Sequence, residues 1–277
     1  MRQFVTTRLQ RSWDIRAAGN FSFGGTGSGL IVTSALALAA DGASVVAVIA
    51  GLGLIALGLL CVWLEIGKPW RAINVFFHPR TSWMSREALL LPPLFAAGGA
   101  TVLDIRFAVL TAALAAAFLY CQARMLHASR GIPAWCQNEV VPLILTTGLA
   151  EGTGAYLVVA NSPRSMIAVA LAAGIAREIA RAAYRRGLIQ AKAPAGTLAW
   201  FSSREEKLLT AARLVSIGLL ALALAGLNTA AVGGALAVLT GWGLKAMLIV
   251  RAAFTRGHVI PHTPMRGRGG GHLVVPM

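Results

Sequence analysis

Residues 43–65, ASVVAVIAGLGLIALGLLCVWLE, contain no charged side chain before Glu65. An α-helix rises about 1.5 Å per residue, so this run can cross the roughly 30 Å hydrocarbon core of a bilayer. Similar apolar runs recur along the chain, and lipid allows only helices for such segments. The sequence therefore predicts an all-α integral membrane bundle of about eight transmembrane helices, at roughly 20–41, 43–65, 87–103, 107–124, 139–160, 165–184, 208–227 and 230–253.

The composition supports the same fold class. Of the 277 residues, 57% are hydrophobic and only 13% are charged, whereas ordinary globular domains carry about a quarter charged residues. We therefore expect residues 1–277 to form a single membrane domain. The net charge of +15 would suggest nucleic acid in a soluble protein. Here the basic residues lie mostly between apolar runs, which excludes nucleic acid as a partner and leaves lipid as the surrounding solvent.

The basic residues also predict the orientation. Seventeen Lys and Arg lie in the N-terminal segment, the long connections and the C-terminal tail, whereas the short connections carry only Arg106 and Arg164. Basic loops stay in the cytoplasm. The predicted location is a bacterial inner membrane, with the N-terminal segment 1–19 and the basic tail 255–277 both cytoplasmic.

Several ionisable side chains fall within the predicted helices or at their ends. A charge at membrane depth costs about 2.5–3.5 kcal/mol or more, so it faces a polar cavity or a partner, or reaches the interface on a long stem. We expect the stems of Arg177, Arg181 and Arg251 to reach the interface. Glu65 and Glu87 are too short to do so and are candidates for function. Glu151 lies near mid-membrane, as part of a hydrogen bond between helices or of a proton path.

A glycine-rich run, GGTGSG at 24–29, opens the first apolar segment. A dinucleotide-binding fingerprint needs a preceding strand and a βαβ unit, and the sequence offers neither. Two interpretations stay open. The small residues allow close packing of helices, or they form a smooth wall for a flat ligand.

The connection after the second helix gathers polar and aromatic residues. It reads EIGKPWRAIN at 65–74 and HPRTSWMSRE at 78–87. Ser82 or Ser85 can cap the third helix, and Pro92 and Pro93 free the carbonyls of Ala88 and Leu89 from their usual donors. The alternative interpretation is an aromatic belt at the interface, followed by a kinked helix.

A pocket of this composition suits a quinone. A quinone head group needs hydrophobic walls, hydrogen-bond donors and an ionisable group connected to water. Glu87 and Glu65 are the predicted catalytic residues. The predicted quinone contacts in this connection are Arg71, Trp83, Ser85 and Arg86.

Haem and iron–sulfur clusters are not expected in this chain. None of the five histidines lies inside an apolar run, and the three cysteines Cys61, Cys121 and Cys136 show no CxxC spacing. Haem anchors use histidines on helices, and a cluster generally needs four thiolates. We expect no metal site here.

The run 65–74, followed by Ser82, Ser85 and Glu87, resembles the second connection of membrane anchors in the dimethyl-sulfoxide reductase and polysulfide reductase (NrfD-like) superfamily. The resemblance implies a haem-free bundle of about eight helices that reacts with ubiquinone or menaquinone. It also implies a ferredoxin-like iron–sulfur subunit and a molybdopterin catalytic subunit on the cytoplasmic side, which hold the metal cofactors. By the same resemblance Glu87 matches an acidic residue associated with quinol, and Asn20 a polar quinone contact. Glu65 stands where the dimethyl-sulfoxide anchor has a histidine.

Within this superfamily, residues 13–21, WDIRAAGNF, look like the anchor of phenylacetyl-CoA:acceptor oxidoreductase. Anchors of sulfite dehydrogenase or of a dimethyl-sulfoxide-type reductase are the alternatives. A secondary transporter is the rival from another class, because it would also have buried charges and broken helices. It predicts an internal repeat, and none is evident.

Overall fold

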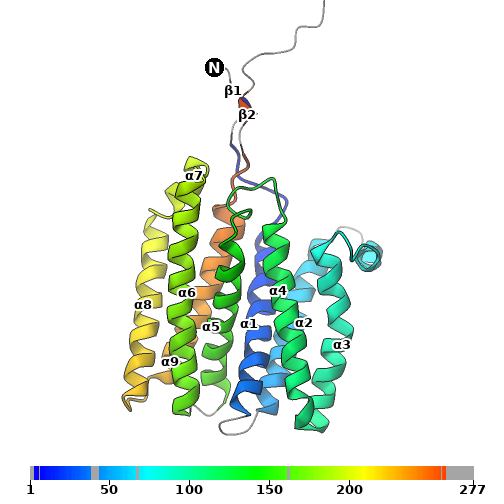
Figure 1. The fold of residues 1–277 in the computed structure, drawn as a ribbon, viewed down its shortest axis with the longest axis vertical. Helices are drawn as coiled ribbons and strands as arrows, with labels where there is room; N and C mark the ends of the chain where they lie inside the picture. The colour runs from blue at the N-terminus through cyan, green and yellow to red at the C-terminus, as the bar shows by residue number, and fades with distance from the viewer. Residues whose placement is uncertain are drawn as a thin grey trace, which may run out of the picture.

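The computed structural model describes residues 3–5, 7–38, 44–66, 69–160, 163–256 and 258–259. Within these ranges eight long helices lie side by side as one bundle (Figure 1). They are α1 (Ile15–Ala37), α2 (Val45–Glu65), α3 (Trp83–Leu103), α4 (Ala108–His127), α5 (Val140–Val159), α6 (Arg164–Gln190), α8 (Arg204–Leu224) and α9 (Ala230–Ala246).

Shorter elements join these helices. The 3₁₀ helix η1 (Pro69–Phe77) precedes α3, and the 3₁₀ turn η2 (Ile105–Phe107) precedes α4. The short helix α7 (Ala195–Trp200) lies between α6 and α8, and a π-helical segment, η3 (Met247–Arg251), ends α9.

The bundle is an integral membrane fold, as the apolar runs predict. Five described helical segments are long and apolar enough to cross a membrane by length and composition alone: those of α2, η2 with α4, α5, α8, and α9 with η3. The other three long helices are more polar. α1 carries the glycine-rich run, α3 begins among polar residues, and α6 carries several charged side chains.

Three helices, α1, α3 and α8, begin four or five residues before their predicted starts, because capping side chains lie upstream of the apolar runs. The side chain of Asp14 accepts a hydrogen bond from the N–H of Arg16 (2.7 Å), so α1 begins at Ile15 rather than at residue 20. Ser82 caps α3 by accepting from the N–H of Ser85 (3.3 Å). Of the two serines considered, Ser82 is therefore the cap, and Glu87 falls in the second turn of α3.

The two ends of the chain pair with each other. Strand β1 (Gln3–Val5) runs antiparallel to β2 (His258–Val259), and a further bridge joins Leu9 to Phe254. These strands, α7 and the long connections lie at one end of the bundle, and the short turns lie at the other (Figure 1). The eight helices described above cross the membrane, and this even number brings β1 and β2 to the same end of the bundle. Of the predicted basic tail 255–277, residue 257 and residues 260–277 lie outside the described part.

α1 packs at the centre of the bundle, against α2, α4, α5 and α9. Its glycines allow this. A Cβ placed on Gly29 would overlap the carbonyl of Gly148, and one placed on Gly152 would overlap the backbone of Gly29. On another side of α1, a Cβ on Gly27 would lie 2.5 Å from the carbonyl oxygen of Gly51. The interpretation as close helix packing is correct for these glycines.

A fully buried ion pair joins three helices at the centre. The Nζ of Lys245 on α9 donates to Oε2 of Glu151 on α5 (2.7 Å) and to the carbonyl of Phe21 on α1 (2.9 Å). Thr26 of α1 also donates to Glu151 (2.8 Å) and accepts from the indole N–H of Trp242 (2.8 Å). Glu151 therefore makes hydrogen bonds between helices, one of its two predicted environments.

The prediction for Arg177 is wrong, because its side chain is fully buried. The helix places Arg177 near the middle of α6, too far from either end for its stem to reach the interface. Its Nη1 instead donates to the carbonyl of Ala237 on α9 (2.9 Å). Arg251, near the end of the bundle, is exposed as expected.

A second network of charges links α6 to α8. The carboxylate of Glu178 forms ion pairs with Arg181 and Arg213, each with an N–O distance of 2.8 Å. The carboxylate of Glu206 forms ion pairs with the same two arginines, at 3.1 and 3.0 Å. Arg181 therefore meets partners on its own helix and on α8 instead of standing free at the interface.

Gly152→Val should separate α1 from α5, because the new side chain would overlap backbone that cannot move aside. We expect the free energy of unfolding to fall by about 3 kcal/mol or more, the upper range for overpacking. Thermal unfolding of the purified chain in detergent measures this. Gly53→Val is the matched control, since nothing lies within 4 Å of a Cβ at Gly53. Equal stability of the two variants would contradict the packing described.

Lys245→Met should destabilise the bundle by about 3–5 kcal/mol, because it leaves Glu151 buried without its counter-ion. The double variant Glu151→Gln/Lys245→Met removes both charges and should recover most of that loss. Arg106→Gln breaks the exposed pair with Asp104 and should leave the stability almost unchanged, because water and salt screen such a pair. A double variant as unstable as Lys245→Met would show that the pair does not act as a unit.

Candidate quinone site

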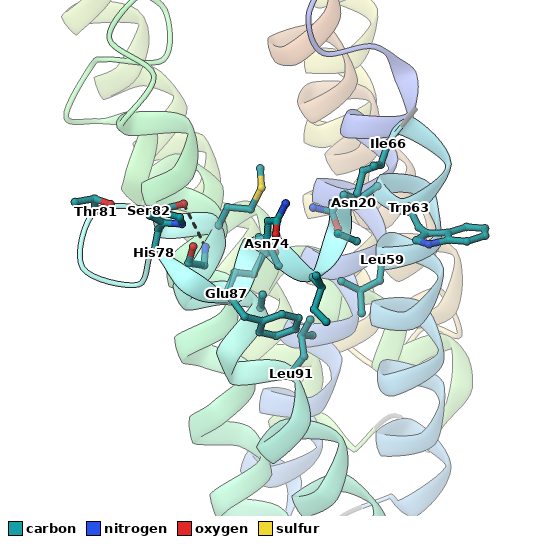
Figure 2. A pocket seen from close by; sticks show the side chains of 18 residues that line it. Asn20, Leu59, Trp63, Ile66, Asn74, His78, Thr81, Ser82, Glu87 and Leu91 are labelled. Atoms are coloured by element: carbon teal, nitrogen blue, oxygen red, sulfur yellow. Dashed lines mark hydrogen bonds between the residues drawn. The ribbon is translucent and has the colours of Figure 1, made fainter. Parts of the chain in front are cut away.

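A large cavity opens between α2, η1 and α3 near the polar end of the bundle (Figure 2). Its volume is about 840 Å³. Exposed side chains such as Trp63 and Ile73 form its outer rim. Its lining comprises Asn20 of α1, Leu59, Val62, Trp63 and Ile66 from α2 and its end, Ala72, Ile73, Asn74, Val75, Phe76, His78, Thr81 and Ser82 from η1 and the following loop, and Met84, Ser85, Glu87, Ala88 and Leu91 of α3.

A second cavity, of about 250 Å³, lies beside the first. Both are lined by Glu87, Asn20 and Met84. The second cavity continues to Glu65 at the end of α2 and to the exposed Ser12 before α1. Glu87 thus stands between a large, mainly apolar space and a smaller one that leads toward the polar end.

Glu87 is a buried carboxyl without a counter-ion. It is 5% exposed, and no Lys or Arg of the described residues forms an ion pair with it. The side-chain amides of Asn20 on α1 and Gln122 on α4 approach the carboxyl. Oε1 of Glu87, Oδ1 of Asn20 and Oε1 of Gln122 are all buried, and none has a hydrogen-bond partner in the described structure.

Three unpartnered acceptors in one place have a physical cost. Buried polar atoms in folded proteins are almost always hydrogen-bonded, and leaving one unpaired costs about 1–3 kcal/mol. A donor is therefore required among Asn20, Glu87 and Gln122. A proton on the carboxyl, a water molecule or a hydroxyl of a bound ligand could supply it.

The packing of α1 fixes this polar group. Gln122 donates through Nε2 to the carbonyl of Asn20 (3.2 Å), which ties α4 to α1. A Cβ on Gly24 would overlap the amide of Gln122, and one on Gly58 of α2 would lie 3.2 Å from Oδ1 of Asn20. Small residues at these two positions leave room for the amides.

The outer end of the second cavity is held by an ion pair. Arg16 donates to the carboxylate of Asp14 (2.7 Å) and, through Nη1, to the carbonyl of Leu64 on α2 (2.6 Å). The hydrogen bonds from Arg16 hold the pKa of Asp14 below its usual range. Asp14 therefore stays ionised near neutral pH, whereas Glu65, which lines this cavity, takes part in no ion pair within the described residues.

The structure places the predicted site residues in different surroundings. Glu87, Asn20 and Ser85 line the large cavity, and Glu65 lines only the smaller one. Trp83 and Arg86 line neither; they stack on each other, with the guanidinium carbon 4.1 Å from the ring centroid. Arg71 belongs to η1, but its side chain lies outside the described part.

Gln122 was not predicted, although it belongs to the polar group around Glu87. An amide in an otherwise apolar helix is a signal for a polar contact inside the membrane. Its partners could not be inferred, because which face of α4 meets α1 is decided by packing. His78 also lines the large cavity and was considered only as a haem ligand.

The remaining candidates lie elsewhere. Glu151 lines neither described cavity. Within the described ranges no three His, Cys, Asp or Glu side chains gather in a group that could hold a metal ion. Burial raises the pKa of the Cys136 thiol, so this thiol is not poised as a ligand.

The geometry combines a mainly apolar cavity, a buried carboxyl that can carry a proton, and a smaller cavity that continues to Glu65 and the exposed Ser12. No curated protein sequence matches the chain at a significant level. A family model, described as polysulphide reductase, NrfD, matches residues 4–256. The chain therefore belongs to the NrfD polysulphide reductase family of membrane helical bundles, which anchor molybdoenzyme complexes and interact with quinone.

Proposed function

We propose that the chain exchanges electrons and protons with membrane quinone in the large cavity, as the quinone-reactive subunit of an oxidoreductase complex. One observation carries the proposal. Glu87, buried and without a counter-ion, is shared by an apolar cavity rimmed by exposed side chains and by a smaller cavity that leads to the polar end. Ligand and protons can thus reach the same carboxyl by separate paths.

The residues present fit a quinone head group. The volume of about 840 Å³ lies within the usual range for small-molecule sites, and the walls from α2 and η1 are mainly apolar. A quinone takes up or releases protons as it takes up or releases electrons. The unpartnered oxygens near Glu87 can accept from hydroxyls of the reduced form, and the amide of Asn20, which lines the cavity, carries N–H donors for the carbonyls of the oxidised form.

We assign the proton transfer to Glu87 and Glu65. The amides of Asn20 and Gln122 hold the carboxyl of Glu87 at the boundary between the two cavities. There it can take a proton from one side and give it to the other. Glu65, at the outer end of the smaller cavity, exchanges protons with the surface. Ser85 lies in the cavity wall beside Glu87 and is a further candidate contact.

The complex is proposed from family membership. Anchors of this family partner with iron–sulfur and molybdopterin subunits. We infer that these subunits hold the metal cofactors and that they dock at the basic end, on the cytoplasmic side of a bacterial inner membrane. The run 13–21 favours phenylacetyl-CoA as the substrate of the catalytic subunit, since a CoA thioester is cytoplasmic. The potentials of substrate and quinone set the direction of electron flow.

Glu87→Gln tests the proton transfer, because it keeps size and hydrogen bonding but removes the titratable proton. In the assembled complex, quinone-linked turnover should fall by roughly 10²-fold or more, the scale for a positioned acid–base group. Turnover with a soluble dye, which bypasses the quinone, should be unchanged. Steady-state assays with each electron acceptor or donor measure both.

Glu205→Gln is the matched control, because Glu205 is exposed at the start of α8 and should leave both activities unchanged. Wild-type quinone turnover in Glu87→Gln across neutral pH would refute the assignment. Equal loss of the two activities would instead make Glu87 a structural residue.

The orientation is tested by reporter insertion at the two ends of the bundle. A fluorescent protein after Lys192, between α6 and α7, should fold in the cytoplasm and fluoresce. Alkaline phosphatase after Asp104, between α3 and α4, should be exported and active. The reverse pattern would place the basic end outside the cytoplasm and exclude a cytoplasmic CoA substrate.

A further inference from the structure

Two arginines share one indole on the outer flank of the bundle. The guanidinium carbon of Arg86, in the first turn of α3, lies 4.1 Å from the centroid of the Trp83 ring. That of Arg124, in the last turn of α4, lies 5.0 Å from the same centroid. Tyr120, one turn before Arg124, meets Trp83 edge to face at 5.7 Å.

This pair of cations has no balancing carboxylate. Neither Arg86 nor Arg124 takes part in an ion pair within the described residues. Arg86 donates hydrogen bonds through Nε to the carbonyl of Pro79 (2.7 Å) and through Nη2 to the carbonyl of Arg80 (3.0 Å). The Nε of Arg124 is buried and has no hydrogen-bond partner in the described part.

Helix electrostatics add to the imbalance at Arg86. The last turn of a helix favours a cation such as Arg124, whereas the first turn favours an anion. Arg86 stands in the first turn of α3, where its charge is disfavoured. A bound anion would balance the charges of Arg86 and Arg124 and would interact favourably with the positive end of the α3 dipole.

The surroundings indicate which anion. Leu89 (44%), about one turn after Arg86, and Tyr120 (41%), one turn before Arg124, are exposed on the flank of membrane-spanning helices. Trp and Tyr are enriched where the hydrocarbon meets the head groups. An anion at this level, beside exposed apolar side chains, is the phosphate of a lipid.

We propose that Arg86 and Arg124, stacked on Trp83, form a binding site for the head group of an anionic phospholipid. The acyl chains lie along the exposed side chains of α3 and α4. The site is distinct from the quinone cavity but adjoins it, because Arg86 holds the loop at Pro79 and Arg80 that leads to Thr81 and Ser82 in the cavity wall. An acidic partner subunit is less suited, since the arginines lie on the flank and not on the terminal surface.

The test uses the full chain, purified in neutral detergent and stripped of lipid. Phosphatidylglycerol or phosphatidylcholine is added, and bound lipid is measured by native mass spectrometry. The wild type should bind phosphatidylglycerol roughly 10- to 30-fold more tightly than phosphatidylcholine, as expected for two arginines near one phosphate. In Arg86→Gln/Arg124→Gln this preference should disappear.

Arg106→Gln, at the opposite end of the bundle, should retain the preference. Arg86→Lys/Arg124→Lys keeps both charges and should retain part of it, which answers the objection that the glutamine variant is misfolded. The proposal is overturned if the glutamine variant keeps the wild-type preference, or if phosphatidylcholine binds the wild type equally well. It is also overturned if inorganic phosphate alone displaces the lipid at equal concentration.

Discussion

The backbone contact between α1 and α5 sets how the rest of the bundle can assemble. At Gly29, Gly148 and Gly152 the two helices approach until no side chain fits between them. In lipid there is no hydrophobic force to drive helices together, so such contacts depend on dispersion and on hydrogen bonds made at short range. Because α1 lies this close to its neighbours, the carbonyl of Asn20 can accept from Gln122 on α4, and the carbonyl of Phe21 can accept from Lys245 on α9.

Two buried glutamates, Glu151 and Glu87, differ in the groups that surround their carboxylates. Glu151 has an ammonium group at 2.7 Å and a hydroxyl donor at 2.8 Å, which together fix its charge and its position. Glu87 has two neutral amides and two cavities, but no cation within ion-pair distance in the described structure. The first arrangement holds three helices together, whereas the second leaves a carboxyl that lines two cavities, and to this carboxyl we assign the proton transfer.

Much of the architecture could be predicted from the sequence, because the period and length of apolar runs are local properties. The eight helices follow from such patterns, and so does a cap of α3 at either Ser82 or Ser85. Glu87 is predicted from its place at a helix end, whereas Asn20 is implied only by the resemblance to NrfD-like anchors. The predictions that could not be made correctly depend on which faces of the helices pack against each other. Arg177 was expected at the interface because its stem is long, but α9 offers it a carbonyl inside the bundle. Trp83 and Arg86, close to Glu87 along the chain, point to another side of α3, and Gln122 is distant in sequence from the residues that it approaches.

Because β1 pairs with β2, the polar end of the bundle can form only late during synthesis of the chain. Gln3 aligns with Val259, so the segment before α1 leaves the ribosome well ahead of the segment after α9 with which its backbone pairs. Contacts this distant along the chain close slowly. Between those events all eight helices must be inserted, and a chain that lacks α9 cannot form this strand pair. The terminal surface is thus complete only on a chain whose membrane part is complete, and any subunit that recognises this surface would distinguish finished anchors from truncated ones.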